Sequence, residues 1–542
     1  MKNEDEKNKI LPYQHQGHKK PKTRRDFIAQ GFIGLSTSLV LPSFTSMVMR
    51  SNPALAQERG CEIPSFQGGL PYICIDGGGG MNIAGANAFV SMAENSEVQD
   101  DLDYPGASTS DYIRIGVSPE EHPNQSGREL EGKYGLKFHR ASGILQGMNQ
   151  VLDGHNMPNS RPISDGVDGL IFCTRTSDDT ATNPINTVFM ANLAGADGQL
   201  VPLIGNASSA TGARSSAPAS MINPAKRPTR VNSSATASGL LSLGSELSGG
   251  NYINLAGSGG QERVQKFMDR ISKMSKTKLE DISKKRSIAQ IQSVLNCSLE
   301  NAKTLFSTFS ATMLDPTNDS AVQAAFAQTT LAADQNNAIN DSFANPGGNV
   351  ASVAKLVIDK IAGAGTITIG GCDYHGNAIA TTHEKDRQIG EAIGRCILLA
   401  SQKGENVAIH LYTDGGVASD AGGATQPQVI PGIGAVNKVM HVGDSGTRSS
   451  ALLIVYKHDH DGSSLVRENN NSQPRRQVGN FIKNGGVDLT TVIGDSTENL
   501  WKAIMLNYLA AQGKEGDFED IFGTGSLPPE HESLIRMKDI TG

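Results

Sequence analysis

The chain has 542 residues, of which 37% are hydrophobic and 19% charged, a composition typical of a globular protein large enough to bury a sizeable core. Its 60 glycines and single Trp predict many loops and turns. The formal net charge of −7 lacks the basic excess of nucleic-acid-binding proteins, so we expect no nucleic-acid partner.

Residues 1–56 have the pattern of an export signal. A basic segment ends in Arg24-Arg25, and a weakly apolar run over 31–49 and a small-residue cleavage signal ending at Ala56 follow it. This pattern is typical of a twin-arginine signal peptide, which predicts the twin-arginine export machinery as a partner and a periplasmic or secreted location. The alternative is an uncleaved membrane anchor, for which the apolar run is short.

Residues 57–542 are predicted to form a single α/β domain. Cleavage after Ala56 would remove nine Lys and Arg against four Asp and Glu and make the formal net charge −12. No later apolar run has the length of a transmembrane helix, so the mature part is not expected to span a membrane. All six cysteines lie in this part without CxxC spacing, which excludes a zinc ribbon. We expect buried thiols at Cys74, Cys173 and Cys396, and at most one or two disulfides.

In the first half of the mature chain, apolar runs alternate with turn-rich segments. In chain order, we predict a strand over 71–75, a helix over 83–92, a long loop over 94–135, a strand over 169–174, a helix over 186–196, a strand over 199–204 and an irregular connector over 206–238.

Residues 261–345 are predicted to be a helical insertion. Apolar residues recur there at intervals of three and four, as expected for an amphipathic helix: Val264, Phe267, Met268, Ile271 and Met274. The Lys and Arg residues between and after them are interpreted as a solvated helix face, with an anion-binding patch as the alternative.

The last third again alternates helices and strands. We predict a helix over 350–361, a strand over 366–369, a helix over 384–402, and strands over 407–412 and 452–456. Strands that alternate with helices indicate βαβ units. The predicted fold is therefore α/β, with a mainly parallel central sheet and helices on both faces.

Several predicted strands run directly into an Asp or a His. In open α/β sheets, ligands bind beyond the carboxyl ends of parallel strands, so these side chains should converge if their strands are parallel neighbours. Carboxylates and imidazoles can bind zinc, manganese or a similar divalent metal without any cysteine. Such a metal could polarise a phosphoryl or sulfuryl oxygen, or activate water. The candidate ligands are Asp76, Asp373, His375, Asp414, His458 and His460.

Each of these motifs also has a purely structural interpretation. Asp76 and Asp414 precede glycines and fit turn residues. Asp373 and His375 would point to the same face of an extended segment and fit a structural pair, and 458–462 fits a solvated hairpin turn. The glycines after Asp76 also fit a phosphate cradle, although GxGxxG spacing with a downstream acid and a terminal Lys-Ser/Thr are both missing.

The combination of the leader with "DGGGGMN", "LIGNASSATGARSSAP", "GGCDYHGN", "YTDGG" and "RRQVGNF…GVDLTTVIGD" resembles the domain of unknown function 1501 family over most of the mature chain. That family is similar in sheet order and strand-end motifs to the alkaline phosphatase and sulfatase superfamily, which has paired metals and a hydroxyl nucleophile at these strand ends. The resemblance implies an alkaline-phosphatase-like fold. It also implies Asp76, Asp373, His375 and Asp414 as metal ligands, with His458 or His460 as the last one.

The sequence departs from that superfamily at the nucleophile. Residues 77–82 are four glycines, Met81 and Asn82, so no hydroxyl or thiol follows Asp76. "YTDGG" also lacks the neighbouring Asp-His pair, which removes a ligand of the second metal. Two hypotheses follow. The first is an exported metal-dependent phosphate or sulfate ester hydrolase that uses water activated by the metal, and the second is a non-catalytic periplasmic binding or envelope-assembly protein on the same fold.

Overall fold

A computed structural model describes the chain from residue 68 to its end, with internal gaps. The described residues are 68–93 without 86, 109–176 without 124, 183–205, 217–222, 228–241, 266, 308–327, 346–413 without 375–378, 415–419, 427–429, 437–439, and 441–542 without 471 and 484. The predicted export signal over 1–56 and most of the predicted helical insertion over 261–345 lie outside the described residues.

A seven-stranded sheet forms the centre of the protein, in the order β14-β5-β13-β8-β1-β7-β6. β1 pairs in parallel with β7 and β8, β6 with β7, and β14 with β5, whereas β13 runs antiparallel to β5 and β8. Each predicted strand coincides with one of these, which confirms the α/β class and the mainly parallel sheet. The strands are β1 (Tyr72–Gly78), β5 (Val167–Thr174), β6 (Val201–Ile204), β7 (Ala362–Gly370), β8 (Val407–Thr413), β13 (Ser449–Tyr456) and β14 (Gln477–Val478).

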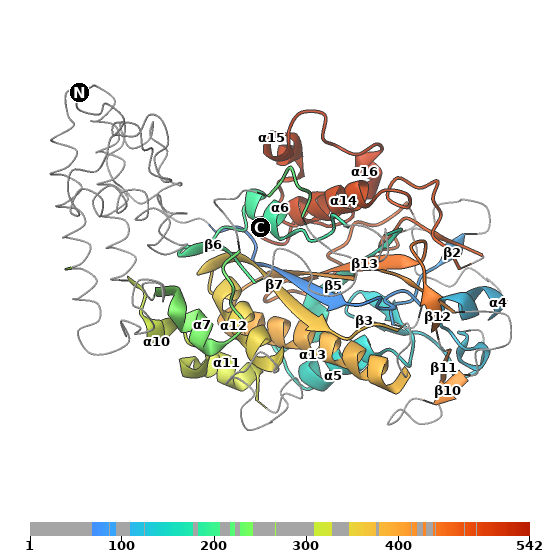
Figure 1. Cartoon of the computed structure of the whole chain (residues 1–542), viewed down its shortest axis with the longest axis horizontal. Helices are drawn as coiled ribbons and strands as arrows, with labels where there is room; N and C mark the ends of the chain where they lie inside the picture. Colours follow the sequence, from blue (N-terminus) through green and yellow to red (C-terminus); the bar gives the residue numbers. More distant parts are fainter. Residues whose placement is uncertain are drawn as a thin grey trace, which may run out of the picture.

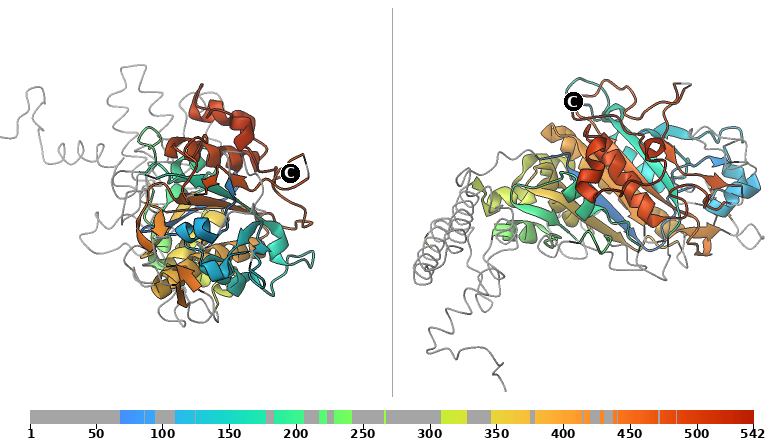
Figure 2. Two further views of the ribbon diagram at one scale, coloured as in Figure 1. Left: turned by 90° about the vertical axis from the view of Figure 1, so that its right-hand side faces the viewer. Right: turned by 90° about the horizontal axis from the view of Figure 1, so that it is seen from above.

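Helices cover both faces of the sheet (Figures 1 and 2). One face is covered by α5 (Gly143–Leu152), α12 (Pro346–Ile358) and α13 (Ile379–Lys403), and the other by α6 (Val188–Leu193) and α14 (Thr497–Ala510). The alternation of side chains along β1 explains the two cores, because successive residues of a strand point to opposite faces. Ile73 and Ile75 belong to the core under α5 and α13, whereas Tyr72 and Cys74 belong to the core under α6 and α14.

α5 and α13 cross closely because glycines lie at their contact. A Cβ atom at Gly147 would lie 2.0 Å from the carbonyl oxygen of Arg387, and one at Gly390 would lie 2.0 Å from that of Ile144. This crossing fixes the first half of α13 against α5 and thereby places the buried polar residues that α13 carries there.

Two parts of the sequence-based prediction for the first half need correction. Residues 83–92 do not form a helix. Gly85 has φ +85° and its N–H donates to the carbonyl of Ala88 in a tight turn, after which the chain runs into β2 (Met92–Ala93). The predicted loop over 94–135 contains α4 (Thr109–Tyr112) and β3 (Glu131–Lys133). The local Ala content favoured a helix, but the turn and the pairing of this segment with distant strands override it.

Other shorter helices lie where the connector and the insertion were predicted. α7 (Ser234–Ser238) ends the connector, and α10 (Ala311–Leu314) and α11 (Ser320–Ala325) lie in the described part of the insertion. β4 (Leu136–Phe138) completes a hairpin with β3.

In the part of the chain that the structure describes, no helix is both long and apolar enough to cross a membrane. Cys74, Cys173 and Cys396 are buried thiols, as predicted, and Cys372 is a fourth. Burial raises the pKa of Cys74 and of Cys396 to about 12, so these thiols stay protonated at neutral pH. Cys61 and Cys297 lie outside the described residues.

The close crossing of α5 and α13 predicts that Gly390→Ala destabilises the protein. The new methyl group would collide with the backbone of α5, and overpacking of this kind costs about 1–3 kcal/mol, more than the up to about 1 kcal/mol that Ala gains over Gly in a helix. Urea denaturation of the mature protein measures the change. Gly132→Ala is the control because a Cβ atom at Gly132 would have no atom within 4 Å beyond its own residue and its two chain neighbours. An unchanged midpoint for Gly390→Ala would contradict this packing.

Candidate functional site

Asp76 lies near the carboxyl end of the central strand β1 and is fully buried. Its register partners are Thr368 on β7 and Tyr412 on β8, so three parallel strands bring polar side chains into one row. The hydroxyl of Thr368 donates to Oδ2 of Asp76 at 3.5 Å. Asp76 is therefore a carboxylate inside a strand at the middle of the sheet, and its interpretation as a turn residue is wrong.

The glycines after Asp76 allow the loop to pack against the loop that follows β7. The carbonyl of Gly78 accepts from the N–H of Cys372 at 3.0 Å, and that of Gly80 accepts from the N–H of Tyr374 at 3.2 Å. Gly79 has φ +94°, and a Cβ atom there would lie 2.9 Å from Cβ of Asp373. The glycine segment thus lets Asp373 approach the end of β1, which a side chain at residue 79 would prevent.

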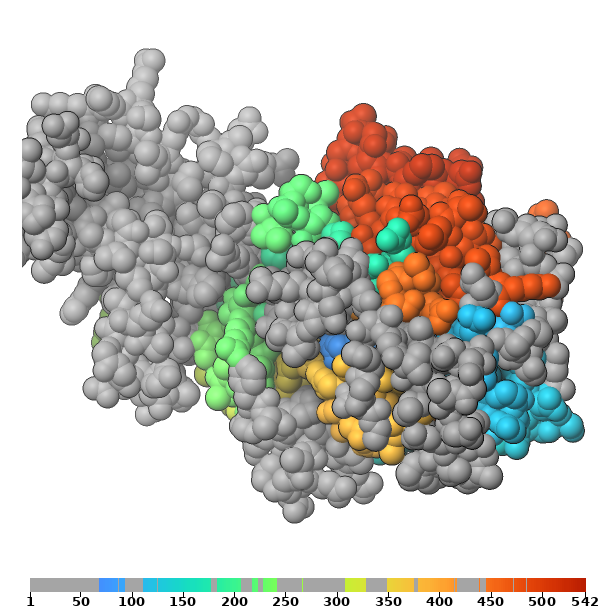
Figure 3. All heavy atoms as spheres, turned by 45° about the vertical axis from the view of Figure 1, so that its right-hand side comes forward, coloured from blue at the N-terminus to red at the C-terminus, as the bar shows by residue number. Residues whose placement is uncertain are grey.

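The same segment is also tied to β8. The N–H of Met81 donates to the hydroxyl of Thr413 at 2.9 Å. The carboxyl ends of β1, β7 and β8 therefore meet at one edge of the sheet, as predicted. In Figure 3, a small blue area from the segment around β1 lies beside yellow atoms from the segment around β7 and α13.

The structure brings together part of the predicted ligand set. Asp76 and Asp373 lie on adjoining strand ends at this edge. His375 and Asp414 lie outside the described residues, directly after Tyr374 and Thr413 of the same two strand ends. Their assignment as ligands stays a prediction.

His458 and His460 do not lie with Asp76, which corrects the predicted convergence. They follow β13, and because β13 is antiparallel, its last residue Tyr456 pairs with Val407 and Val167 at the beginnings of β8 and β5. The two histidines therefore lie at the opposite edge of the sheet.

The contacts of the two histidines fit the structural interpretation of a turn. The N–H of His458 donates to Oδ1 of Asn406 at 2.7 Å, and Nε2 of His460 lies 2.6 Å from the carbonyl oxygen of Ser463. A polar hollow of about 510 Å³ lies at this opposite edge, lined among others by Asp168 and Arg476.

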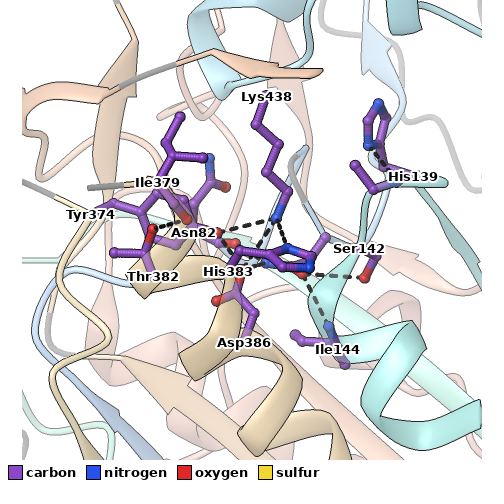
Figure 4. Close-up of polar contacts among 12 residues, drawn as sticks. Asn82, His139, Ser142, Ile144, Tyr374, Ile379, Thr382, His383, Asp386 and Lys438 are labelled. Carbon is purple, nitrogen blue, oxygen red and sulfur yellow. Dashed lines mark hydrogen bonds and ion pairs between the residues drawn. The ribbon is translucent and has the colours of Figure 1, made fainter. Parts of the chain in front are cut away.

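A buried polar cluster lies beside the Asp76 edge, on the α5 and α13 side (Figure 4). Lys438, on β11 (Asn437–Val439), is fully buried. Its Nζ lies 3.3 Å from the hydroxyl of Tyr374, from Nδ1 of His383 and from Oδ2 of Asp386. Asp386 also accepts from the hydroxyl of Tyr374 and, at 2.8 Å, from Nδ2 of Asn87. We call these five residues the Lys438 cluster.

Burial shifts the pKa values of the Lys438 cluster. Burial raises the pKa of Asp386 and lowers that of Lys438, and each partner's charge opposes the shift of the other. Burial, followed by the charge of Lys438, lowers the pKa of His383 to about 3, so His383 is neutral at physiological pH. Its Nε2 lies 3.1 Å from Oε1 of Gln146 on α5.

Sequence reasoning missed the Lys438 cluster because its members come from segments far apart in the chain. One signal was present. His383 and Asp386 lie three residues apart on the face of α13 that also buries Ile379 and Ile389. Polar residues on an apolar helix face indicate a buried polar contact. Nothing local marks Lys438 as buried.

The chemistry of the strand-end residues fits a divalent metal. A fully buried carboxylate such as Asp76 is costly unless cations or hydrogen bonds compensate it, and a second carboxylate, Asp373, lies on the adjoining loop. Among the described residues, no three His, Cys, Asp or Glu side chains come close enough to hold a metal ion. Asp76 and Asp373 would thus need further ligands, and the predicted ones are His375 and Asp414.

Comparison with known proteins adds no relative. No family model matches the chain, and neither the curated proteins nor the solved structures contain a significant match.

The low pKa of His383 predicts a pH-dependent stability. Its pKa is about 3 in the folded protein and 6.5 in the unfolded chain, so below pH 6.5 the unfolded chain takes up a proton that the folded protein does not. This single group should lower stability by about 1.4 kcal/mol per pH unit as the pH falls from 6 to 4. In His383→Gln, the free energy of unfolding measured with urea should change less steeply with pH. The slope should be smaller by about 1.4 kcal/mol per pH unit, the contribution of one proton. Equal slopes for the variant and the wild type would contradict a buried neutral His383.

Proposed function

We propose that the protein is an exported metal-dependent hydrolase of phosphate or sulfate esters on an alkaline-phosphatase-like fold. The twin-arginine pathway would deliver it to the periplasm or beyond. The observation that supports this best is the position of Asp76, a buried carboxylate on the middle one of three parallel strands, with Asp373 on the adjoining strand end. Ligands of open α/β sheets bind at this edge.

Asp76, Asp373, His375 and Asp414 would hold the metal. When bound, a divalent metal at such a site polarises the ester oxygen and lowers the pKa of water. The protein's part is to fix its oxygen donors. The hydroxyl of Thr368 donates to Asp76, and the bonds of Gly78 and Gly80 hold the β7 loop, which carries Asp373, beside the end of β1.

The reaction would use water as the nucleophile. Residues 77–82 offer no hydroxyl or thiol that could form a covalent ester intermediate. Gly79 instead admits the close approach of Asp373, whose Cβ atom would lie 2.9 Å from a Cβ atom at residue 79. We therefore expect a single displacement, with no intermediate on the 77–82 segment.

A second candidate function is a non-catalytic binding or envelope-assembly role on the same fold. It is favoured by the use of the glycine segment for packing. Gly78 and Gly80 bond to the β7 loop and Met81 bonds to β8, so these contacts alone could account for the segment. Metal-dependent activity separates the two candidates.

The proposed hydrolase predicts a defined effect of Asp76→Asn. The mature protein, supplied with Zn²⁺ or Mn²⁺, should hydrolyse p-nitrophenyl phosphate or p-nitrophenyl sulfate, and chelator should abolish the activity until metal is added back. Asp76→Asn keeps the shape of the side chain and removes its charge. It should lower kcat/KM by about 100-fold or more, since even the loss of a hydrogen-bond partner of a metal ligand costs about 10–100-fold.

Asp461→Asn is the matched control. Asp461 is an exposed carboxylate at the opposite edge of the sheet, with 77% of its side chain accessible, so its loss should leave kcat/KM unchanged. A wild-type protein that binds no metal and hydrolyses neither ester would contradict the hydrolase and favour the binding protein.

A further inference from the structure

We propose that Lys438 is a positioning residue for the strand-end site, acting through Asp386 and Tyr374. This inference rests on the proposed metal site. Tyr374 is flanked in sequence by Asp373 and His375, two of the predicted ligands, and its side chain is anchored entirely inside the protein. Whatever fixes Tyr374 therefore also fixes the backbone of Asp373, which directly precedes it.

Tyr374 is held at two points. Its hydroxyl donates to Asp386 and lies 3.3 Å from Nζ of Lys438, while its backbone N–H donates to the carbonyl of Gly80. The first contact joins the β7 loop to α13 and the β11 strand, and the second joins it to the glycine segment. Rotation or shift of this residue would break at least one buried hydrogen bond, which is costly.

The glycine segment is held by the same carboxylate. Nδ2 of Asn87 lies 2.8 Å from Oδ2 of Asp386 and 2.7 Å from the carbonyl oxygen of Asn82, the last residue of the segment. Asp386 thus links the loops after β1 and β7. Asp76 lies in β1, two residues before its end, and Asp373 lies in the loop after β7. Lys438 supplies the positive charge next to this shared acceptor.

A buried ion pair of this kind is a poor way to gain stability. Taking both charges out of water offsets most of their attraction, and apolar residues of similar size are often as stable or more so. The pair instead fixes the relative positions of its neighbours, because Asp386 is bonded to Tyr374, Asn87 and Lys438 at once. We infer that the Lys438 cluster sets the geometry of the two loops more than the stability of the fold.

The chain offers a matched control in Lys355. This lysine is also buried, and its Nζ lies 2.7 Å from Oδ2 of both Asp319 and Asp359. It lies near the end of α12, directly before β7 begins, and hence at the edge of the sheet opposite Asp76. Lys355→Met removes a buried paired lysine without touching the strand-end loops.

The experiment measures metal binding rather than activity. The full mature protein is titrated with Co²⁺, whose visible absorption reports ligand geometry, and with Zn²⁺ in competition with a chromophoric chelator. Circular dichroism checks whether each variant is folded. The variants are Lys438→Met, Tyr374→Phe, Lys355→Met, and a double variant, Lys438→Met with Asp386→Leu, which replaces the pair by apolar residues in case the single lysine variant does not fold.

We expect Lys438→Met, or the double variant in its place, to weaken Zn²⁺ binding by about 10–100-fold and to shift the Co²⁺ absorption bands. Tyr374→Phe should show the same changes to a smaller extent, and Lys355→Met should bind both metals as the wild type does.

The outcomes separate this inference from the proposed function. If the wild type binds metal and the Lys438 and Tyr374 variants bind it equally well with unchanged spectra, the positioning role is wrong while the metal site stands. Equal weakening in Lys355→Met would also overturn it, since a general loss of stability would then be the cause. A wild type that binds neither metal overturns the metal site and this inference together.

Discussion

The parallel pairing of β1 with β7 and β8 is the constraint on which the candidate site depends. This pairing buries Asp76 between Thr368 and Tyr412 and brings three strand ends to one edge of the sheet. A slip of one residue in β1 would turn Asp76 toward the α5 and α13 core and move the apolar side chains of β1 to the other face. The two apolar cores therefore enforce the register, and the register positions the carboxylate.

The loops at this edge are held by polar contacts as well as by apolar packing. The glycine segment bonds to the β7 loop and to Thr413. Within the Lys438 cluster, Asp386 bonds to Tyr374, and Asn87 donates to the carbonyl of Asn82. Close approach thus explains Gly77 and Gly79, while the acid that precedes the glycines stays a candidate ligand. Buried polar contacts with several partners specify one arrangement, because any other arrangement leaves a polar group without a partner.

Much of this was predictable from the sequence. Short apolar runs, such as the one that ends at Tyr412, predicted the strands. The motif after the first run predicted that Asp76 lies at the carboxyl end of a strand, as the structure shows. The convergence of His458 and His460 with Asp76 required the strand before them to be parallel to its neighbours, and the structure shows that β13 is antiparallel to β5 and β8. Local sequence patterns could not predict the Lys438 cluster, because a buried lysine becomes recognisable only when its partners from distant segments are known.

The most direct test of the central claim is anomalous X-ray scattering from crystals of the naturally exported protein, recorded at the zinc and manganese absorption edges. The claim predicts an anomalous peak within about 2.0–2.3 Å of a carboxylate oxygen of Asp76, with Asp373 beside it. A crystal with no peak at this edge of the sheet, or with its peak at His458 and His460 instead, would contradict it.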